Sequence, residues 1–252
     1  MSTWILLRGL TREAGHWGRF PHLWRDEIAH DRVIALDLPG NGAFNAVTSP
    51  LSVSEAASHC RTVLAQQGVP PPYRLLAMSM GGMVATAWAQ QYPAEIEACV
   101  LINTSFAAFS PLRERLRPGA WASLLQLLFT RNARSREQLV FSLTSRLMQA
   151  PPALLNEWVA IRESRPVRVQ NALRQLTAAA RFRPPPRAPV PSLVLASAED
   201  GLVNPRCSRE IARRWNCAIA VHPTAGHDLP LDEGQWVARE VRAWLFASST
   251  PH

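Results

Sequence analysis

A serine between two small residues is the strongest chemical signal in the sequence. Ser79 follows a short apolar run typical of a buried strand and directly precedes a helix-length segment. This small-x-Ser-x-Gly spacing is typical of a nucleophile elbow, in which a strand turns into a helix at a strained residue. Ala77 and Gly81 have to be small because strand and helix approach closely there. The pattern predicts that Ser79 is a nucleophile and that the Met80 amide donates to a developing oxyanion; the alternative is an ordinary serine at the start of a helix.

Alternating strands and helices are the elements that would position this serine. Apolar runs typical of buried parallel strands lie at Trp4–Leu7, Arg32–Leu36, Tyr73–Ala77, Ala98–Ile102, Ser192–Ala196 and Ala218–Val221. Helix-length segments lie between most of them, at Val53–Gln67, Met80–Gln91, Pro205–Trp215 and Glu233–Phe246. Such alternation implies right-handed crossovers and a doubly wound α/β sheet.

The chain resembles the α/β-hydrolase family along almost its whole length. The serine motif carries this resemblance together with two turns nearer the N-terminus. The family's oxyanion loop has the form His-Gly-x, and Arg8-Gly9-Leu10 occupies its place, so the resemblance implies Leu10 as the second oxyanion amide while Arg8 replaces the histidine. The segment 37–42 is similar to the family's D-x-x-G-x-G turn, for which we expect a structural role. Because Trp4 leaves no room for the family's usual antiparallel strand pair, we expect about six parallel strands with helices on both faces.

The resemblance also implies an acid and a base. Asp200 follows a late apolar run, at the position of the family's acid, with Glu199 beside it as a rival, whereas the earlier acid position holds Asn103. His227 lies in the Gly-His segment that carries the family's base, and no lysine in the chain competes with it. The implied chemistry is acyl transfer, in which His227 takes the proton of Ser79 and water later cleaves an acyl-enzyme. This chemistry requires no cofactor and no metal.

The alternation of strands and helices stops between Ile102 and Ser192, where about ninety residues carry helical periodicity. That stretch is too long for a plain loop. We interpret 105–188 as an inserted helical lid, loosely similar to that of pimeloyl-carrier methyl ester carboxylesterases, and 1–104 with 189–252 as the core domain. Residues Trp121–Phe129 are nearly all apolar. A second apolar group predicts another lid helix, and its members are Leu139, Val140, Phe141, Leu143, Leu147 and Met148.

Positive charge is concentrated in this predicted lid. Residues 105–188 contain 14 arginines and four glutamates, a net charge of +10, whereas the whole chain carries +8. A basic lid over an apolar pocket could receive an anionic or carrier-linked acyl group, and a solvated helix face is the alternative. We find no nucleic-acid recognition motif beside the arginines. The candidates for lining the substrate are Arg8, His16, Trp17, Arg113, Arg115 and Arg117.

Composition excludes several classes of protein. No apolar run approaches the roughly 20 residues of a membrane-spanning helix, and the first residues lack a signal-peptide pattern, so a cytoplasmic protein is expected. The four cysteines lack C-x-x-C spacing and are expected to be free thiols. The histidines other than His227 show no metal-ligand spacing. The tail 247–252 is expected to fray.

The sequence therefore predicts a serine hydrolase of carboxylic esters with small or medium acyl groups. Thioesters, lactones and carbon–carbon bonds are alternatives on the same residues, because fold and triad do not fix the substrate. Enzymes of this fold that use an aspartate nucleophile are disfavoured by Ser79. A binding module without catalysis is disfavoured by the intact set of Ser79, Asp200 and His227. The pattern indicates no oligomeric state.

Overall fold

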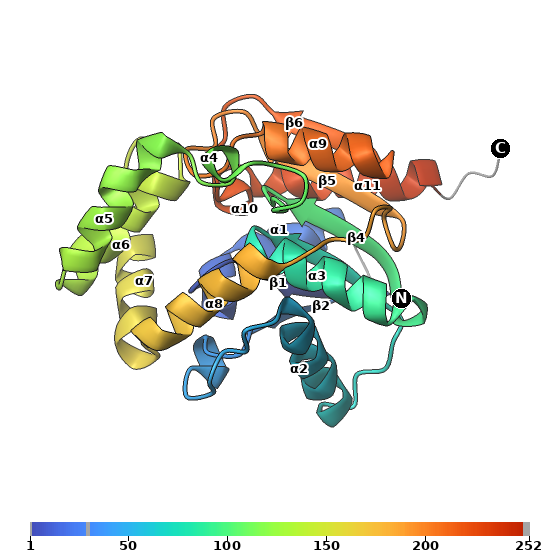
Figure 1. The fold of residues 1–252 in the computed structure, drawn as a ribbon, viewed down its shortest axis with the longest axis horizontal. Coiled ribbons are helices and arrows are strands. Elements are labelled where there is room, and N and C mark those ends of the chain that lie inside the picture. The colour runs from blue at the N-terminus through green and yellow to red at the C-terminus, as the bar shows by residue number, and fades with distance from the viewer. Residues whose placement is uncertain (1, 29–30, 249–252) are drawn as a thin grey trace.

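A sheet of parallel strands lies at the centre of the fold in the computed structural model, which describes residues 2–28 and 31–248. These residues form six strands in the order β2-β1-β3-β4-β5-β6, and every described pairing is parallel (Figure 1). The strands are β1 (Thr3–Leu7), β2 (Arg32–Leu36), β3 (Tyr73–Met78), β4 (Ile96–Ile102), β5 (Ser192–Ser197) and β6 (Ala218–His222). Each begins and ends within two residues of the expected run, so the predicted doubly wound sheet is confirmed.

Helices cover both faces of this sheet. They are α1 (Phe20–Glu27), α2 (Val53–Gln66), α3 (Met80–Gln91), α9 (Arg206–Trp215), α10 (Leu229–Asp232) and α11 (Gly234–Ser248). Strand residues alternate between the faces: Leu6 and Leu76 pack with α1 and α11, whereas Ile5 and Leu75 pack with α2, α3 and α9. Helix α11 continues through Ser248, so the expectation that the tail frays from Ala247 is wrong for Ala247 and Ser248. Residues 249–252 of the expected tail lie outside the described residues.

The direction in which the chain winds reverses between β1 and β3. The chain passes from β1 outward to β2 and then returns to the other side of β1 to form β3. In open parallel sheets, ligands bind beyond the carboxyl ends of the strands where the winding direction reverses in this way. The loop after β1 and the residue after β3, Ser79, meet at this point.

The stretch between β4 and β5, all of it described, contains only helices as regular structure. They are α4 (Leu112–Arg115), η4 (Pro118–Ala120), α5 (Trp121–Phe129), α6 (Ala133–Thr144), α7 (Pro152–Ser164) and α8 (Val169–Arg181). Figure 1 shows α5, α6 and α7 standing to one side of the sheet and α8 leading back towards α3. We keep the name lid for residues 105–188, and the domain division stays a prediction.

The second lid helix is shorter than the sequence predicts. Helix α6 ends at Thr144, so Leu147 and Met148 lie outside it, and Met148 is fully exposed. A distant carboxylate explains the early end: the Ser145 hydroxyl donates to Asp232 Oδ1 at 2.5 Å and the next amide donates to Asp232 Oδ2 at 2.9 Å. These bonds hold Ser145 in an extended conformation. The expectation of a helix through Met148 was wrong. The residue that ends the helix, Asp232, lies 87 positions from Ser145 in the sequence, so the local apolar pattern could not reveal it.

One other feature of the described chain matches the sequence. Cys60, Cys99, Cys207 and Cys217 are free thiols. Among residues 2–28 and 31–248, no helix has both the length and the apolar character needed to cross a membrane.

A buried carboxylate fastens the lid to the loop after β1. Glu137 of α6 is wholly buried, and its Oε2 accepts from Arg12 Nη1 at 2.7 Å while its Oε1 accepts from Arg162 Nε on α7. Arg165, just beyond α7, pairs in addition with Glu13 of the same loop. The lid is therefore held on the core by ion pairs whose carboxylates are buried.

Replacing Glu137 should destabilise the protein strongly. Glu137→Gln would leave Arg12 and Arg162 facing a neutral amide, and loss of one partner from a buried ion pair costs about 3–5 kcal/mol. The matched control is Glu157→Gln, at an exposed position on α7, which should change stability by about 0.5 kcal/mol or less. Urea unfolding followed by circular dichroism measures both variants. Equal midpoints for the two would contradict a structural role for the buried carboxylate.

Candidate active site

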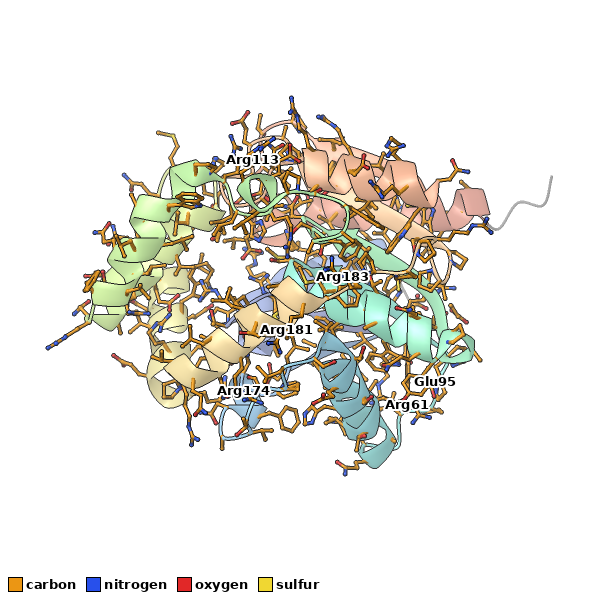
Figure 2. All side chains as sticks on the ribbon, viewed as in Figure 1. Arg61, Glu95, Arg113, Arg174, Arg181 and Arg183 are labelled. Atoms are coloured by element: carbon orange, nitrogen blue, oxygen red, sulfur yellow. The ribbon has the colours of Figure 1, made fainter. Side chains whose placement is uncertain are left out.

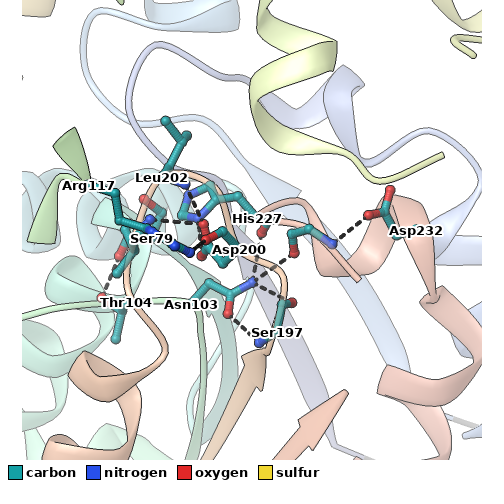
Figure 3. A network of polar contacts seen from close by, with 11 residues as sticks. Ser79, Asn103, Thr104, Arg117, Ser197, Asp200, Leu202, His227 and Asp232 are labelled. Atoms are coloured by element: carbon teal, nitrogen blue, oxygen red, sulfur yellow. Dashed lines mark hydrogen bonds and ion pairs between the residues drawn. The ribbon is translucent and has the colours of Figure 1, made fainter. Parts of the chain in front are cut away.

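Ser79 lies at the sharp turn between β3 and α3. Its backbone has φ 54° and ψ −121°, a conformation that non-glycine residues rarely adopt. Two neighbours hold it there: the Ser79 amide donates to the Ile102 carbonyl at 2.8 Å, and the Thr104 hydroxyl donates to the Ser79 carbonyl at 2.6 Å (Figure 3). The strained turn that the sequence predicts at this serine is present.

Close packing around the turn explains its small residues. A Cβ atom on Gly81 would lie 2.5 Å from the Leu7 carbonyl oxygen, so only glycine fits. A Cβ on Gly9 would lie 3.0 Å from the Ser79 Cβ, which places the loop after β1 directly against the serine. Leu10 follows Gly9, and Met80 follows the serine as the first residue of α3. Both amides expected to bind an oxyanion therefore belong to backbone segments that meet at Ser79.

A carboxylate and an imidazole pair beside this serine. His227 Nδ1 lies 2.7 Å from Asp200 Oδ2, and the two side chains are 6% and 1% exposed. The other oxygen, Asp200 Oδ1, accepts from the amides of Leu202 and Val203 at 2.8 and 2.9 Å. With Nδ1 bound to the carboxylate, Nε2 is the nitrogen left to face a reacting group.

Figure 3 shows Ser79, Asp200 and His227 gathered at one place. The Ser79 hydroxyl makes no hydrogen bond to any described residue. Such bonds are often long in enzymes without substrate and shorten in the reacting complex. The rival acid, Glu199, is exposed, whereas Asp200 is buried against the histidine, so the geometry favours Asp200.

The surroundings of His227 change its basicity in opposing directions. Burial has the largest influence and lowers its pKa, but the charge and the hydrogen bond of Asp200 and the charge of Asp228 together outweigh burial. The pKa of His227 is therefore raised above its ordinary value of 6.5.

This shift predicts how activity depends on pH. A general base must be neutral, so kcat/KM for an ester should fall as the pH drops through the raised pKa of His227, with a midpoint above pH 6.5. Asp228→Asn removes one of the charges that raise this pKa and should move the midpoint to lower pH. The measurement is a pH–rate profile of both proteins. A midpoint below 6.5, or one that Asp228→Asn leaves in place, would count against His227 as the base.

Sequence reasoning missed Asn103 as a part of the site. It lies just after β4 with φ 46° and is 2% exposed. Its amide nitrogen donates to the His227 carbonyl and to the Ser197 hydroxyl, both at 2.9 Å, and its oxygen accepts from the Ser197 amide at 2.9 Å. An aspartate here would turn a negative charge towards carbonyl oxygens. The sequence placed Asn103 at an earlier acid position of the family, but it gave no sign of these hydrogen bonds.

Arg8 occupies the position where the family has a histidine, and it forms a buried ion pair. Its two terminal nitrogens donate to Asp228 at 3.0 and 2.5 Å, and the side chains are 3% and 2% exposed. Its guanidinium lies 4.9 Å from the centre of the Trp17 ring, which stacks in turn on Phe20. Arg8 thus joins the loop after β1 to the residue that follows His227.

The other candidates for lining the substrate are placed differently. Arg117 donates from its side chain to the Asp200 carbonyl at 2.6 Å and from its amide to the Leu202 carbonyl at 2.8 Å, so it supports the loop of the acid. Arg115 donates to the Ala179 carbonyl on α8 at 3.2 Å, and Arg113 is exposed on the outer side of α4 (Figure 2). His16 is buried beside Glu13, whose amide donates to its Nδ1 at 3.1 Å.

No group of metal-ligating side chains occurs in the part of the chain that the structure describes. Across residues 2–28 and 31–248, no three His, Cys, Asp or Glu side chains gather in a way that could hold a metal ion. His30 and His252 lie outside these residues.

Comparison with known proteins places the chain in a family. The model of the alpha/beta hydrolase family matches residues 4–240. Over 242 residues the chain is 29% identical to the polyketide synthase ThaQ of Burkholderia thailandensis; the match covers 90% of the chain but only 11% of that much longer protein.

Solved structures show the same fold. A thermophilic esterase from Thermogutta terrifontis, solved with malate bound, superposes with a TM-score of 0.72 at 21% identity, over 99% of this chain and 91% of the esterase. An enol-lactonase from Burkholderia xenovorans LB400 superposes with a TM-score of 0.76 at 18% identity, over 97% of this chain and 91% of the lactonase. The match of the family model over nearly the whole length decides the classification: the chain belongs to the alpha/beta hydrolase family.

Proposed function

We propose that this protein is a serine hydrolase that cleaves carboxylic esters of small or medium acyl groups. The observation that carries the proposal is the buried pair of His227 and Asp200, 2.7 Å apart, beside a serine in a strained turn. Strain of this kind persists at functional sites because surrounding structure enforces it. Membership in the alpha/beta hydrolase family supports the same chemistry.

The proposed ester hydrolysis assigns one role to each of Ser79, His227 and Asp200. Ser79 attacks the ester carbonyl carbon while His227 Nε2 takes the hydroxyl proton, and Asp200 stabilises the imidazolium that forms. The negative charge on the former carbonyl oxygen is received by the amides of Leu10 and Met80. The tetrahedral intermediate then expels the alcohol, which receives the proton from His227, and leaves an acyl group on Ser79. Water repeats the sequence and releases the acid.

A panel of substrates tests this function. The wild type and Ser79→Ala are assayed with 4-nitrophenyl esters from acetate to dodecanoate, with the matching thioesters of N-acetylcysteamine, with lactones and with a carbon–carbon hydrolase substrate. We expect the highest kcat/KM for short or medium oxygen esters and none above background in the variant. Turnover confined to thioesters, lactones or the carbon–carbon substrate would replace the proposed specificity by that one, and turnover of none would refute the function.

A further inference from the structure

Buried cationic and aromatic side chains gather where the loop after β1 meets the lid. The guanidinium of Arg12 lies 4.2 Å from the centre of the Trp158 ring on α7, and the His16 ring lies against the same indole, 5.8 Å between centroids. Arg8 lies over Trp17 in the same way, at 4.9 Å. We call Arg8, Arg12, His16 and Trp17 the donor cluster.

Each member of the donor cluster has one side-chain nitrogen that lacks an acceptor among the described residues. These groups are Arg8 Nε, Arg12 Nη2, His16 Nε2 and Trp17 Nε1. The His16 nitrogen counts as a donor because the other ring nitrogen accepts from the Glu13 amide, which fixes the proton of the neutral ring on Nε2.

Such a concentration of unmatched donors is unusual. Eight buried side-chain nitrogen or oxygen atoms in the described chain lack a partner, and four of them belong to the ten residues 8–17. A buried donor without an acceptor costs roughly 1–3 kcal/mol. Acceptor atoms of a ligand would relieve this cost at all four nitrogens.

The charges around the donor cluster favour one negative charge on that ligand. Three guanidiniums, those of Arg8, Arg12 and Arg162, face two carboxylates, those of Asp228 and Glu137. The nearby carboxylate of Glu13 is paired with Arg165. The carboxylate of Asp37, which follows β2, accepts hydrogen bonds from the backbone amides of Ala14 and Ala43. Burial and the positive charges of Arg12 and Arg8 hold the pKa of His16 well below its ordinary value, so this ring adds no charge.

The donor cluster is close to the serine. The Arg12 amide donates to the Gly9 carbonyl at 3.3 Å, closing a turn that holds the two Cα atoms within about 7 Å of each other. Gly9 itself lies against Ser79. The backbone of Arg12 therefore lies within one turn of the residue that packs against Ser79.

We propose that Arg12 and His16, together with the free N–H groups of Arg8 and Trp17, bind a carboxylate on the ester substrate a few carbon atoms from the scissile carbonyl. Half-esters of short dicarboxylic acids are then the preferred substrates. A carboxylate supplies one negative charge and acceptor oxygens in a plane that a guanidinium matches. The proposal rests on the proposed function, because it names the class of ester that Ser79 attacks.

Binding is tested without turnover, in protein that carries Ser79→Ala. Monomethyl glutarate and its neutral counterpart methyl pentanoate are titrated calorimetrically. We expect monomethyl glutarate to bind more tightly, and Arg12→Gln to weaken its binding by roughly 10- to 100-fold, the range for a hydrogen bond to a charged group. The control is Arg168→Gln, at an exposed position beside the start of α8, which removes the same charge and should leave binding unchanged. Equal binding of the two ligands, or equal loss in both variants, would overturn the proposal.

A second variant keeps the test decisive if Arg12→Gln does not fold. Arg12→Lys retains a cation for Glu137 but cannot present two N–H groups in a fixed plane, so binding of monomethyl glutarate should still fall by about tenfold. Circular dichroism checks the fold of each variant. Undiminished binding in Arg12→Lys with its fold intact would overturn the role of Arg12.

Turnover separates this proposal from the proposed function. In protein with Ser79 present, kcat/KM for 4-nitrophenyl hydrogen glutarate should exceed that for 4-nitrophenyl pentanoate, and Arg12→Gln should abolish the preference. Hydrolysis of both esters without preference would overturn the carboxylate site and leave the esterase proposal standing. If neither ester is hydrolysed but monomethyl glutarate still binds through Arg12, the carboxylate site stands and the esterase proposal fails.

Discussion

Ser79→Ala will lower kcat for ester hydrolysis by up to about a millionfold, the scale on which removal of a triad nucleophile acts. The hydroxyl is the only group in the turn placed to form a bond with the substrate, and only the oxyanion donors and substrate binding would remain. The Ser79 side chain makes no hydrogen bond to described residues, and alanine keeps the Cβ, so stability should change little.

The measurement is hydrolysis of a short 4-nitrophenyl ester by purified variant, with its fold checked by circular dichroism. Ser164→Ala, the same change at an exposed position at the end of α7, is the matched control and should retain the turnover of the wild type. Turnover in Ser79→Ala that stays close to that of the wild type would show that another group is the nucleophile.

The second large effect is expected from the acid. Asp200→Asn should lower kcat by about ten-thousandfold at neutral pH. The amides of Leu202 and Val203 bind Asp200 Oδ1 and would hold the asparagine oxygen in that place. The NH2 group would then face His227 Nδ1 and force the ring proton onto Nε2, where a lone pair is needed to take the proton of Ser79.

Glu199→Gln is the control for Asp200→Asn, because it removes the neighbouring carboxylate at an exposed position. It should change kcat by less than about tenfold, as expected for a surface charge outside the reacting groups. If the two variants were reversed in severity, Glu199 would be the acid and the pair of Asp200 with His227 would have only a structural role.

Local patterns predicted the sheet and the turn at Ser79, and physical reasons explain this success. Buried parallel strands have to be continuously apolar, so the six runs stand out within a few residues each. The glycine at 81 is required by a backbone carbonyl 2.5 Å from where a Cβ would lie, and this requirement is visible in the sequence as a small residue at fixed spacing.

The parts that sequence could not supply are contacts between distant residues. Arg8 could not be interpreted because its partner, Asp228, lies 220 positions away. The end of α6 depends on Asp232, and the donor cluster depends on Trp158 and Glu137 of the lid. Contacts of this kind produce no periodic or local pattern in the sequence.

The net charge of the lid was similarly ambiguous. Several lid arginines make structural links: Arg134 donates to Asn156 at 2.7 Å, Arg136 to the Thr130 carbonyl at 2.7 Å, and Arg174 to the carbonyl of Ser49 in a core loop. Counting charges cannot separate such links from a surface that attracts substrate. We therefore assign the proposed carboxylate binding to Arg12, which the sequence did not single out, and not to the arginines at the start of the lid.

The central claim, that Ser79 is a nucleophile activated by His227, is tested most directly by covalent labelling. The folded protein is treated with a fluorophosphonate, digested and mapped by mass spectrometry, beside Ser79→Ala and His227→Ala. We expect a single adduct on Ser79, no adduct in Ser79→Ala and much slower labelling in His227→Ala. An adduct on another residue of the wild type, or labelling of Ser79 at an undiminished rate in His227→Ala, would contradict the central claim.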